Sequence, residues 1–427
     1  MPRKSAVPSR RSFLQATAAA TAAGGVLLPT GRARAAGNDT LKIGLIGCGG
    51  RGGGAAVNAL RADKGTRLVA LCDAFGDRLD GKHDELKEEF GDRVDVPKER
   101  RYTGFDGYKQ LIDSDVDVVL LVTPPGFRPI HYKYAVEKGK HIFMEKPHAV
   151  DATGIRSVLE STKIAKAKKL CVVSGFCYRY DPPKRETLKM IHDGRIGQVL
   201  AVHTTYLTGD LWFRGNDPAW TAMDYQMRNW YYYTWISGDF MIEQHIHSID
   251  KAAWVMNGEL PVAAQGMGGR QTRTDPKFGN IWDHFTVVYE YASGAKVFSQ
   301  CRQVGGCFGD TSDHVIGTKG SAQLMKHTVT TDAGTTKATA KAKRGDMYQV
   351  EHDEFFAHIR AGTVINDAES SATSSLMGIM GREAAYSGQR ITWDEIKASK
   401  QDLSPAKYAF GDNKVPSAPV PGRYKFV

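Results

Sequence analysis

The sequence lacks the features that would place the protein in a membrane or on nucleic acid. Beyond the first 36 residues, no apolar run approaches the length needed to span a bilayer. No basic block with interleaved aromatic residues occurs either. The formal net charge is +10, but six basic residues and no acids lie within residues 1–36, which leaves +4 for the remainder. We therefore predict neither a membrane span nor a nucleic-acid partner.

Cysteine is scarce, with six residues in a chain of 427. Cys48 lies in a glycine-rich turn and Cys72 closes an apolar strand, so neither is placed for a bridge. The pairs Cys171–Cys177 and Cys301–Cys307 remain open. A chain of this length builds a core without disulfides, so the cysteines do not define the fold.

Strand-like and helix-like segments alternate from residue 41 to about 176. This alternation predicts an α/β Rossmann-like domain with a doubly wound parallel sheet, for which we take residues 38–177. From residue 178 to 400 the pattern changes to alternating strands and two late helices, which predicts an α+β domain with a mostly antiparallel sheet. Within it, residues 328–344 are rich in Thr, Ala and Lys and are expected to be a solvated excursion. Residues 401–427 read as an extended C-terminal arm.

Residues 41–73 contain a complete dinucleotide-binding pattern. An apolar strand leads into Gly47-Cys48-Gly49-Gly50-Arg51-Gly52, a small-residue helix follows, and a second strand ends in Asp73. Gly47 permits the tight turn, Gly49 lets the backbone approach a pyrophosphate, and Gly52 allows close helix–strand packing. Asp73 is placed to accept the hydroxyls of the adenine ribose, which favours NAD, with NADP as the alternative because Arg78 lies near. Residues 41–73 therefore predict a bound dinucleotide.

The first 36 residues are typical of an export signal. Ser9-Arg10-Arg11-Ser12-Phe13-Leu14 is a twin-arginine pattern, an Ala-rich stretch follows, and Ala33-Arg34-Ala35 offers a cleavage site. The alternative is a disordered basic tail. Because the twin-arginine route carries folded proteins, we expect a periplasmic or otherwise exported protein that leaves the cytoplasm with its cofactor already bound.

Several motifs resemble the glucose-fructose oxidoreductase / inositol dehydrogenase (Gfo/Idh/MocA) family, and they extend from about residue 41 to 396. They are Thr123-Pro124, His131, Gly139-Lys140-His141, Glu145-Lys146-Pro147, Gly317-Thr318-Lys319-Gly320-Ser321 and Gly381-Arg382-Glu383-Ala384-Ala385-Tyr386-Ser387-Gly388. The resemblance implies that Lys146 is the central catalytic residue. It also implies a cofactor site built from the following residues: Gly47, Gly49, Gly50, Arg51, Gly52, Asp73, Thr123, Pro124, His131, Glu145 and Lys146.

Glu243, His247 and Asp250 fall on the register of a second family motif. On one helix, Glu243 and His247 would share a face, so we expect His247 to accept the proton and Glu243 to orient it. His245 stands where the family usually has a small residue. It is either a pocket residue, a second acid/base, a metal ligand with His247, or a buried histidine without a catalytic role. No firm third ligand is evident, so no metal site is expected.

Tyr178-Arg179-Tyr180 also resembles the family, in which an arginine after this strand faces the pocket. Arg179 is expected to bind sugar hydroxyls and Tyr178 to assist proton transfer, unless Arg179 forms a salt bridge between domains. Together with His245 and Asp250, Tyr233 completes the predicted substrate site. Tyr233 belongs to a segment, residues 211–235, with nine aromatic residues. Such density is consistent with a saccharide platform, an oligomer interface or ordinary core.

These predictions favour an NAD(P)-dependent oxidoreductase that acts on a sugar or polyol hydroxyl and recycles a tightly bound cofactor. Two redox-neutral cycles are open: dismutation of two sugars, or glycoside cleavage by oxidation, elimination, addition of water and reduction. A non-catalytic sugar-binding protein is the alternative from another class. We also expect a homo-oligomer.

Overall fold

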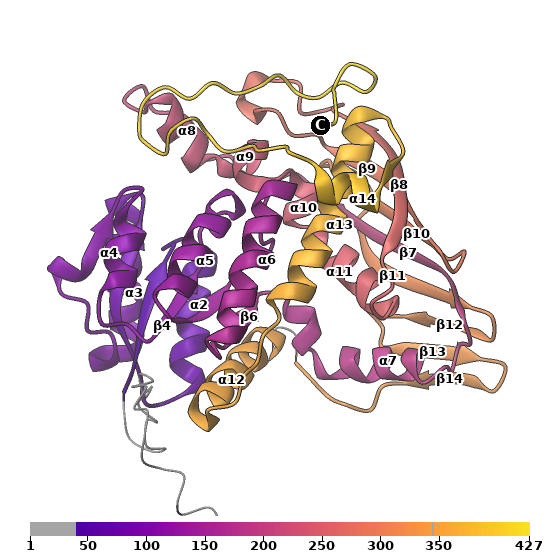
Figure 1. Cartoon of the computed structure of the whole chain (residues 1–427), viewed down its shortest axis with the longest axis horizontal. Helices are drawn as coiled ribbons and strands as arrows, with labels where there is room; N and C mark the ends of the chain where they lie inside the picture. The colour runs from indigo at the N-terminus through magenta and orange to yellow at the C-terminus, as the bar shows by residue number, and fades with distance from the viewer. Residues whose placement is uncertain (1–39, 344–345) are drawn as a thin grey trace, which may run out of the picture. The chain divides into compact units, whose positions relative to one another are not determined.

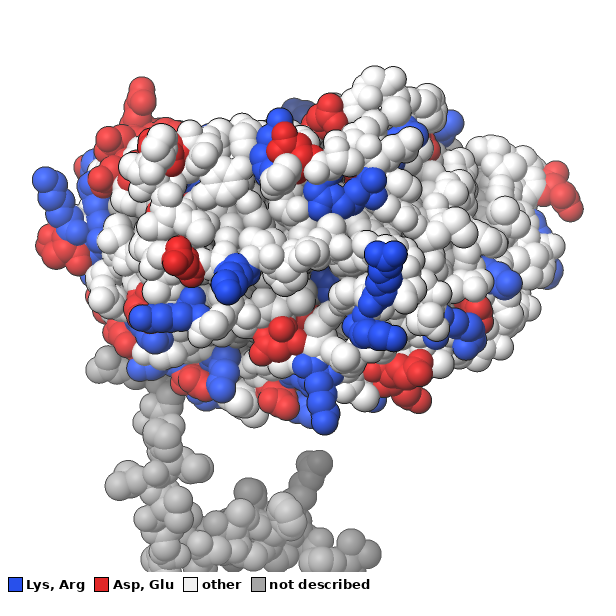
Figure 2. All heavy atoms as spheres, turned by 90° about the horizontal axis from the view of Figure 1, so that it is seen from above, with Lys and Arg blue, Asp and Glu red and all other residues white. Residues whose placement is uncertain are grey.

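A computed structural model describes residues 40–343 and 346–427, so the predicted export signal at residues 1–36 lies outside the described residues. In the described part of the chain, no helix is both long enough and apolar enough to cross a membrane. On the face drawn in Figure 2, acidic and basic side chains are interspersed rather than gathered by sign.

The first sheet is parallel, as the alternation of residues 41–176 predicts. Its strands are β1 (Leu41–Ile46), β2 (Thr66–Asp73), β3 (Arg101–Thr103), β4 (Val118–Leu121), β5 (His141–Met144) and β6 (Val172–Ser174). The order is β3-β2-β1-β4-β5-β6. Because β1 pairs with both β2 and β4, the strand order reverses there. Ligands of doubly wound sheets bind at the carboxyl ends of strands beside such a reversal.

Two groups of buried side chains cover the two faces of this sheet. The helices are α2 (Gly50–Ala62), α3 (Gly76–Phe90), α4 (Gly107–Asp113), α5 (Arg128–Glu137), α6 (Ala152–Ala167) and, from late in the chain, α12 (Asp346–Ala361). Helices α2, α3 and α12 contribute to one group, and α4, α5 and α6 contribute to the other. Helix α12 thus packs on α2, where Gln349 hydrogen-bonds Asn58. A helix from the second half of the chain therefore covers part of one face of the first sheet.

The second sheet is mixed and mostly antiparallel, so the predicted fold class is confirmed for both sheets. Its strands are β7 (Val199–Thr208), β8 (Pro261–Gly269), β9 (His284–Tyr291), β10 (Lys296–Gln303), β11 (Asp310–Gly317), β12 (Gly320–Gln323), β13 (Thr328–Thr331), β14 (Gly334–Lys337) and β15 (Ile391–Thr392). The order is β14-β13-β12-β11-β7-β10-β9-β8-β15. Strand β10 runs parallel to β7, and the other neighbouring strands described in this second sheet run antiparallel.

The remaining helices connect this sheet to the first half. They are α7 (Pro182–His192), α8 (Ala222–Arg228), α9 (Thr234–Ser237), α10 (Phe240–Glu243), α11 (Ile246–Val255), α13 (Ala368–Ser387) and α14 (Trp393–Ala398). The long helix α13 packs on α6 and on β8 and β9, and α11 packs on β7 and β11 (Figure 1). Helix α13 therefore forms much of the contact between the two sheets.

The expectation of a solvated excursion at residues 328–344 is wrong for its first part. Residues 328–337 form the hairpin β13–β14, which extends the second sheet. The turn uses Gly334 at a φ of 109°, and Thr330 and Thr335 form a cross-strand hydroxyl contact of 2.9 Å. Threonine is a strand former because of its β-branched side chain, so the composition alone was a poor guide. The side chains of β14 are nonetheless exposed.

Residues 401–427 contain no helix or strand and run along both halves of the chain (Figure 1). The Tyr408 ring lies 5.6 Å from Phe127, and the Phe410 ring lies 5.0 Å from Phe105. Further along, the Pro419 carbonyl accepts a hydrogen bond from the indole of Trp282 at 3.1 Å. We call residues 401–427 the C-terminal arm.

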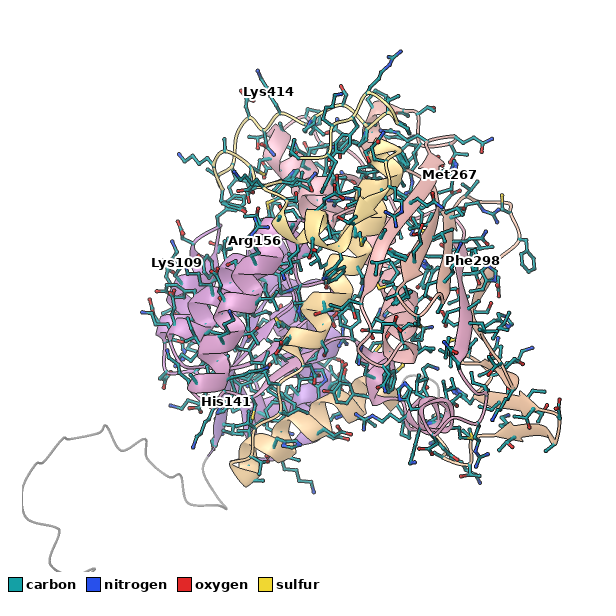
Figure 3. All side chains as sticks on the ribbon, turned by 45° about the vertical axis from the view of Figure 1, so that its right-hand side comes forward. Lys109, His141, Arg156, Met267, Phe298 and Lys414 are labelled. Atoms are coloured by element: carbon teal, nitrogen blue, oxygen red, sulfur yellow. The ribbon has the colours of Figure 1, made fainter. Side chains whose placement is uncertain are left out.

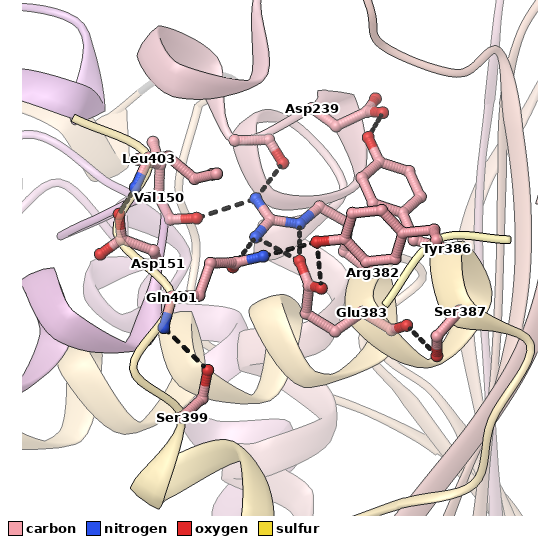
Figure 4. Close-up of polar contacts among 12 residues, drawn as sticks. Val150, Asp151, Asp239, Arg382, Glu383, Tyr386, Ser387, Ser399, Gln401 and Leu403 are labelled. Carbon is pink, nitrogen blue, oxygen red and sulfur yellow. Dashed lines mark hydrogen bonds and ion pairs between the residues drawn. The ribbon is translucent and has the colours of Figure 1, made fainter. Parts of the chain in front are cut away.

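Arg382 fastens the arm to the core in the network drawn in Figure 4. Its buried guanidinium donates to the carbonyls of Val150 at 2.8 Å and Gly238 at 3.0 Å. It also pairs with Glu383 at 2.7 Å and donates to Gln401 of the arm at 3.0 Å. One side chain of α13 thereby holds the segment after β5, the end of α9 and the arm together.

Candidate active site

The glycine turn between β1 and α2 has the geometry of a phosphate cradle. Gly47 has a φ of 101°, and a Cβ atom there would lie 2.7 Å from the backbone of Val122. A Cβ on Gly52 would lie 1.8 Å from the Gly47 carbonyl, so helix and strand pack as closely as predicted. A Cβ on Gly49 or Gly50 would meet nothing within 4 Å. The turn therefore leaves room beside the N-terminus of α2, whose N–H groups attract an anion.

Asp73 ends β2 beside this turn. Its two carboxylate oxygens accept backbone N–H groups, one from Cys48 at 2.7 Å and one from Phe75 at 3.0 Å. Burial raises the pKa of Asp73, and the two backbone hydrogen bonds oppose that rise. The carboxylate is thus held in a fixed orientation at the rim of the cavity.

The turn opens into a cavity of about 530 Å³. All of the predicted cofactor residues line it: Gly47, Gly49, Gly50, Arg51, Gly52, Asp73, Thr123, Pro124, His131, Glu145 and Lys146. The later part of the chain supplies Tyr206, Trp212, Arg214, Met227, Trp230, Glu243, Gln244, His247 and Tyr348. The cavity therefore joins the glycine turn to residues of the second half, and its size and open turn fit a dinucleotide.

His131 lies on α5 with its Nδ1 atom 3.3 Å from the Thr123 hydroxyl. Its ring is stacked on Phe127 at 6.0 Å and lies 4.2 Å from Tyr108. Burial lowers the pKa of His131 to about 3, so the imidazole is neutral. It forms a neutral wall of the cavity next to the Thr-Pro turn.

Lys146 follows β5, and the Lys146–Pro147 peptide bond is cis. Its Nζ atom lies 3.0 Å from Glu243 Oε1 and also donates to the Glu243 carbonyl. Burial alone lowers the pKa of Lys146, but the carboxylates of Glu243 and Glu145 outweigh it and leave that pKa above its ordinary value. Lys146 is therefore an ammonium whose partner comes from the other half of the chain.

His247 lies on α11 and lines the same cavity. Its Nδ1 atom is buried and has no hydrogen-bond partner among the described residues. Burial, followed by the charges of Lys146, Lys251 and Arg51, holds the pKa of His247 well below its usual range. The ring is thus a neutral imidazole with an unused nitrogen.

The predicted pairing of Glu243 with His247 is wrong in geometry. The expected single helix is broken, because α10 ends at Glu243 and α11 begins at Ile246. The i, i+4 relationship is lost, and the Glu243 carboxylate binds Lys146 instead. Of the four predicted catalytic residues, the cavity brings together Lys146, Glu243 and His247.

Tyr178 is displaced from the cavity lining and packs behind His247, with the two rings 5.3 Å apart, edge to face. Its own faces lie near two ammonium groups, Lys251 at 4.5 Å and Lys184 at 5.0 Å. Lys251 in turn forms a buried ion pair with Asp313. Tyr178 therefore packs edge to face against His247.

Arg179 and Asp250 satisfy each other rather than facing the cavity. Arg179 Nε lies 2.9 Å from Asp250 Oδ2, and Arg179 Nη2 lies 2.8 Å from Oδ1. Asp250 also accepts the Ser374 hydroxyl at 2.7 Å and is 1% exposed. This pair joins the segment after β6 to α11 and α13, which is the salt-bridge alternative left open above.

His245 and Tyr233 are also placed outside the cavity lining. His245 is fully buried, its Nε2 atom lies 2.6 Å from the Ser299 hydroxyl, and burial lowers its pKa to about 3. The break between α10 and α11 turns this residue toward the sheet, so it is a core histidine. Tyr233 is buried against Tyr225, with ring centroids 6.5 Å apart.

The aromatic side chains of residues 211–235 lie in two environments. Trp212 and Trp230 line the cavity, whereas the side chains of Tyr231, Tyr232, Tyr233 and Trp235 are buried in the core. The segment is therefore both cavity wall and core. Within the described residues, no group of three or more His, Cys, Asp or Glu side chains is arranged to hold a metal ion.

Arg51 makes a network that the sequence did not predict. Its guanidinium contacts Glu145, whose other oxygen accepts the Lys146 N–H at 3.2 Å. It also binds Glu351 of α12 at 3.0 Å and lies over the Tyr348 ring at 4.9 Å. Glu351 is separated from Arg51 by 300 positions, so no local pattern could have revealed it. The phosphate turn, the lysine loop and α12 are thus coupled.

Comparisons with known proteins agree with this architecture. Residues 41–176 match the model of the oxidoreductase family with an NAD-binding Rossmann fold, and residues 185–323 match the Gfo/Idh/MocA C-terminal domain. An inositol 2-dehydrogenase of Rhizobium meliloti is 27% identical over 324 residues, which cover 75% of this chain and 86% of that protein. A glycosyl hydrolase family 109 protein of Porphyromonas gingivalis is 33% identical over 178 residues, covering 41% of this chain and 36% of that protein.

Among solved structures, scyllo-inositol dehydrogenase of Lactobacillus casei with bound NAD(H) and scyllo-inositol has a similar fold. The TM-score is 0.64 at 19% identity, covering 83% of this chain and 99% of that one. The two family models together span both sheets, and the chain belongs to the Gfo/Idh/MocA family of NAD-binding oxidoreductases.

Proposed function

We propose that this oxidoreductase transfers a hydride between NAD and a carbon that carries a hydroxyl in a sugar or polyol. The observation that carries the proposal is the convergence of Lys146 and His247 on the cavity that contains the glycine turn. The names of the relatives, inositol dehydrogenases among them, support a polyhydroxylated substrate.

The side chains divide the proton chemistry between them. The nicotinamide supplies the hydride acceptor when the cofactor is bound. The Lys146 ammonium donates a hydrogen bond to the substrate oxygen, which eases loss of the hydroxyl proton as the carbonyl forms. His247, a neutral imidazole that lines the cavity, accepts that proton. Glu243 positions Lys146 by the contact at 3.0 Å.

NAD is the proposed cofactor, with NADP as the alternative. Asp73 lies at the end of β2, where an acid accepts the hydroxyls of an adenine ribose. The bound NAD(H) of the L. casei relative supports the same assignment. In this proposal the cofactor stays bound through turnover and is reoxidised in place by a second substrate molecule.

Export by the twin-arginine route is part of the same proposal. It rests on Arg10-Arg11 and the small-residue cleavage pattern in residues 1–36. A protein outside the cytoplasm has no supply of fresh nucleotide, so a redox-neutral cycle on a captive cofactor fits such a location. The proposed compartment is the periplasm or its equivalent.

A second candidate is NAD-dependent glycoside cleavage, which the similarity to the glycosyl hydrolase family 109 protein favours. In this cycle a ring hydroxyl is oxidised, and the neighbouring C–H becomes acidic. The glycosidic oxygen then leaves by elimination, water adds, and the hydride returns. His247 and Glu243 are the cavity residues available as bases.

We also propose that the chain assembles with copies of itself through the outer face of the second sheet. Met267 is 71% exposed and Ile316 is 51% exposed on this sheet. Figure 3 places Met267 and Phe298 on the side of the sheet away from α13. Sedimentation of the purified chain, and of a Met267→Lys variant, tests this assembly.

The test of the catalytic proposal uses the mature chain as purified. Its absorbance in the reduced-nicotinamide band is followed while sugars and polyols are added, and then aryl glycosides without added NAD. A reversible absorbance change supports hydride transfer, and release of the aryl group supports the cleavage cycle. No change with any ligand, together with measurable sugar binding, would establish a binding protein and overturn the proposal.

A further inference from the structure

Two arginines line the cavity without an acidic partner. Arg78 lies in the first turn of α3, and Arg214 lies in the loop between β7 and α8. Both line the same cavity as Asp73. Among the described residues, neither guanidinium forms an ion pair or a hydrogen bond. Their charges are instead supported by aromatic rings, Phe75 at 5.6 Å from Arg78 and Trp212 at 4.7 Å from Arg214.

A third arginine nearby differs from these two, because an acidic side chain neutralises its charge. Arg228 of α8 binds Asp77 with two contacts, at 3.1 Å and 3.2 Å. It lies over the Phe75 ring at 4.0 Å and outside the cavity lining. Burial lowers the pKa of Arg78; the nearby charge of Asp73 raises it, and the like charges of Arg228 and Arg214 lower it. The three cations are therefore close enough to interact, while one of them has its own counterion.

Asp73 does not cancel the remaining positive charge. Both of its oxygens accept backbone N–H groups. Among the described residues, the Asp73 carboxylate forms no ion pair with Arg78. One carboxylate faces two guanidinium groups along this stretch of the cavity. Because unpaired like charges repel, their assembly beside a cavity is stabilised when an anion binds there.

The loop that carries Arg214 is held in place before any ligand arrives. The fully buried side chain of Asn229 accepts the Arg214 N–H at 2.9 Å and donates to the Gly215 carbonyl at 3.0 Å. It also donates to the Tyr225 carbonyl of α8 at 3.2 Å. The backbone on both sides of the Arg214 Cα is thus fixed, which lowers the entropy lost when its side chain binds.

We propose that Arg78 and Arg214 form a phosphate-binding pair for the dinucleotide, in addition to the glycine turn. The proposal rests on the proposed function, because it takes the cavity to be the cofactor site. A planar guanidinium matches phosphate oxygens with two parallel hydrogen bonds, so two of them can hold one phosphate group. That group is either the pyrophosphate, present in both nucleotides, or the 2′-phosphate, present only in NADP.

The test measures binding to the chain freed of nucleotide by unfolding in urea, removal of the nucleotide and refolding. Quenching of tryptophan fluorescence gives the Kd, since Trp212 and Trp230 line the same cavity. The ligands are NAD, NADP and adenosine, which carries no phosphate. The variants are Arg78→Ala and Arg214→Ala, with Arg214→Lys to retain the charge. Arg67→Ala is the matched control, because Arg67 pairs with Asp95 on the surface and does not line the cavity.

The outcomes separate the two phosphates. If the pair holds the pyrophosphate, each alanine variant raises the Kd of NAD and NADP alike by about tenfold or more, with adenosine unchanged. If it holds the 2′-phosphate, the Kd of NADP rises while that of NAD stays within twofold. In both cases Arg214→Lys recovers part of the affinity, and the control matches the wild type.

The proposal is overturned if the wild-type chain binds either nucleotide and both alanine variants bind it equally well. Failure of the wild-type chain to bind any dinucleotide overturns the proposed function itself, so the two failures are distinguishable. Thermal unfolding of each variant confirms that it is folded, and Arg214, which is exposed, can be replaced without removing a buried contact.

Discussion

The Nζ atom of Lys146 lies 3.0 Å from the Oε1 atom of Glu243, and the two residues come from opposite halves of the chain. Lys146 follows β5 of the parallel sheet, and Glu243 ends α10. Their contact is what keeps the ammonium over the cavity and sets its charge. The first prediction concerns this contact.

Removing the Lys146 ammonium should abolish most of the activity. We expect Lys146→Met to lower kcat by about 10²–10⁴-fold, the usual contribution of a positioned acid/base group. Glu243→Gln keeps the shape of the partner and should lower kcat by about tenfold, because the ammonium loses its counterion. Initial rates with the best sugar of the panel measure both effects. Glu369→Gln, on the surface pair with Lys166, is the control, and equal losses in all three variants would contradict the assignment.

The pH dependence of kcat/KM should show a wide plateau. His247 has a pKa well below 6.5, because burial and the charges of Lys146, Lys251 and Arg51 disfavour the imidazolium. The pKa of Lys146 is raised above 10.5 by Glu243 and Glu145. The base is therefore free and the ammonium intact from below pH 6.5 to above pH 10. An acidic limb near or above pH 6.5 that disappears in His247→Ala would contradict this geometry.

The Arg51 network should control stability and cofactor binding together. Arg51→Ala leaves Glu145 and Glu351 without their common partner, and Glu351 is fully buried. Because Arg51 is one-third exposed, we expect a loss of about 3 kcal/mol in the free energy of unfolding, at the low end for a broken buried pair. Urea unfolding measures it. In a double-mutant cycle with Glu351→Gln, the two losses should not add.

Acid should destabilise the fold through four buried histidines: His131, His148, His245 and His352. Burial lowers the pKa of each to about 3, whereas the unfolded chain has the ordinary value near 6.5. The folded state binds fewer of these protons, so stability is intact above pH 6.5 and falls as the pH drops toward 3. Each histidine contributes about 1.4 kcal/mol per pH unit within that window.

Urea unfolding at pH 6.5, 5.8 and 5.0 measures this slope. His245→Gln should reduce it by the share of one histidine. A free energy of unfolding that is constant between pH 6.5 and 5.0 would exclude the effect.

The C-terminal arm should slow cofactor release. Tyr408 and Phe410 back the rings of Phe105 and Phe127, which line the cavity. We expect Phe410→Ala to reduce the free energy of unfolding by about 1–2 kcal/mol, less than a fully buried ring because 43% of Phe410 is exposed. Nucleotide dissociation should become faster. Stopped-flow exchange measures the rate, and Lys414→Ala, on the outer side of the arm (Figure 3), should not alter it.

Local spacing and the family resemblance together predicted residues that line the cofactor side of the cavity. The strand, glycine turn, helix and second strand up to Asp73 lie within 33 consecutive residues, so their spacing alone determines the geometry. The lysine loop, which directly follows β5, was predicted from the family resemblance. All eleven residues predicted for this site line the cavity.

The positions of the substrate-side residues depend on contacts between segments that lie far apart in the sequence. A helical register placed Glu243 beside His247, but α10 ends at Glu243 and α11 begins at Ile246. Arg179 was assigned to the ligand by the family resemblance, and its partner Asp250 lies 71 positions away. Pairings of this kind are fixed by the meeting of distant elements, which one sequence does not reveal.

The contact between Arg51 and Glu351 sets a limit on when the site can be completed during synthesis. A ribosome makes the glycine turn early, but the residue that supports its arginine follows 300 positions later, and the arm follows after that. The nascent first domain therefore has an unfinished site while most of the chain is still being made. The cavity in its final form, with Glu351 and the arm in place, is therefore complete only after translation has nearly ended.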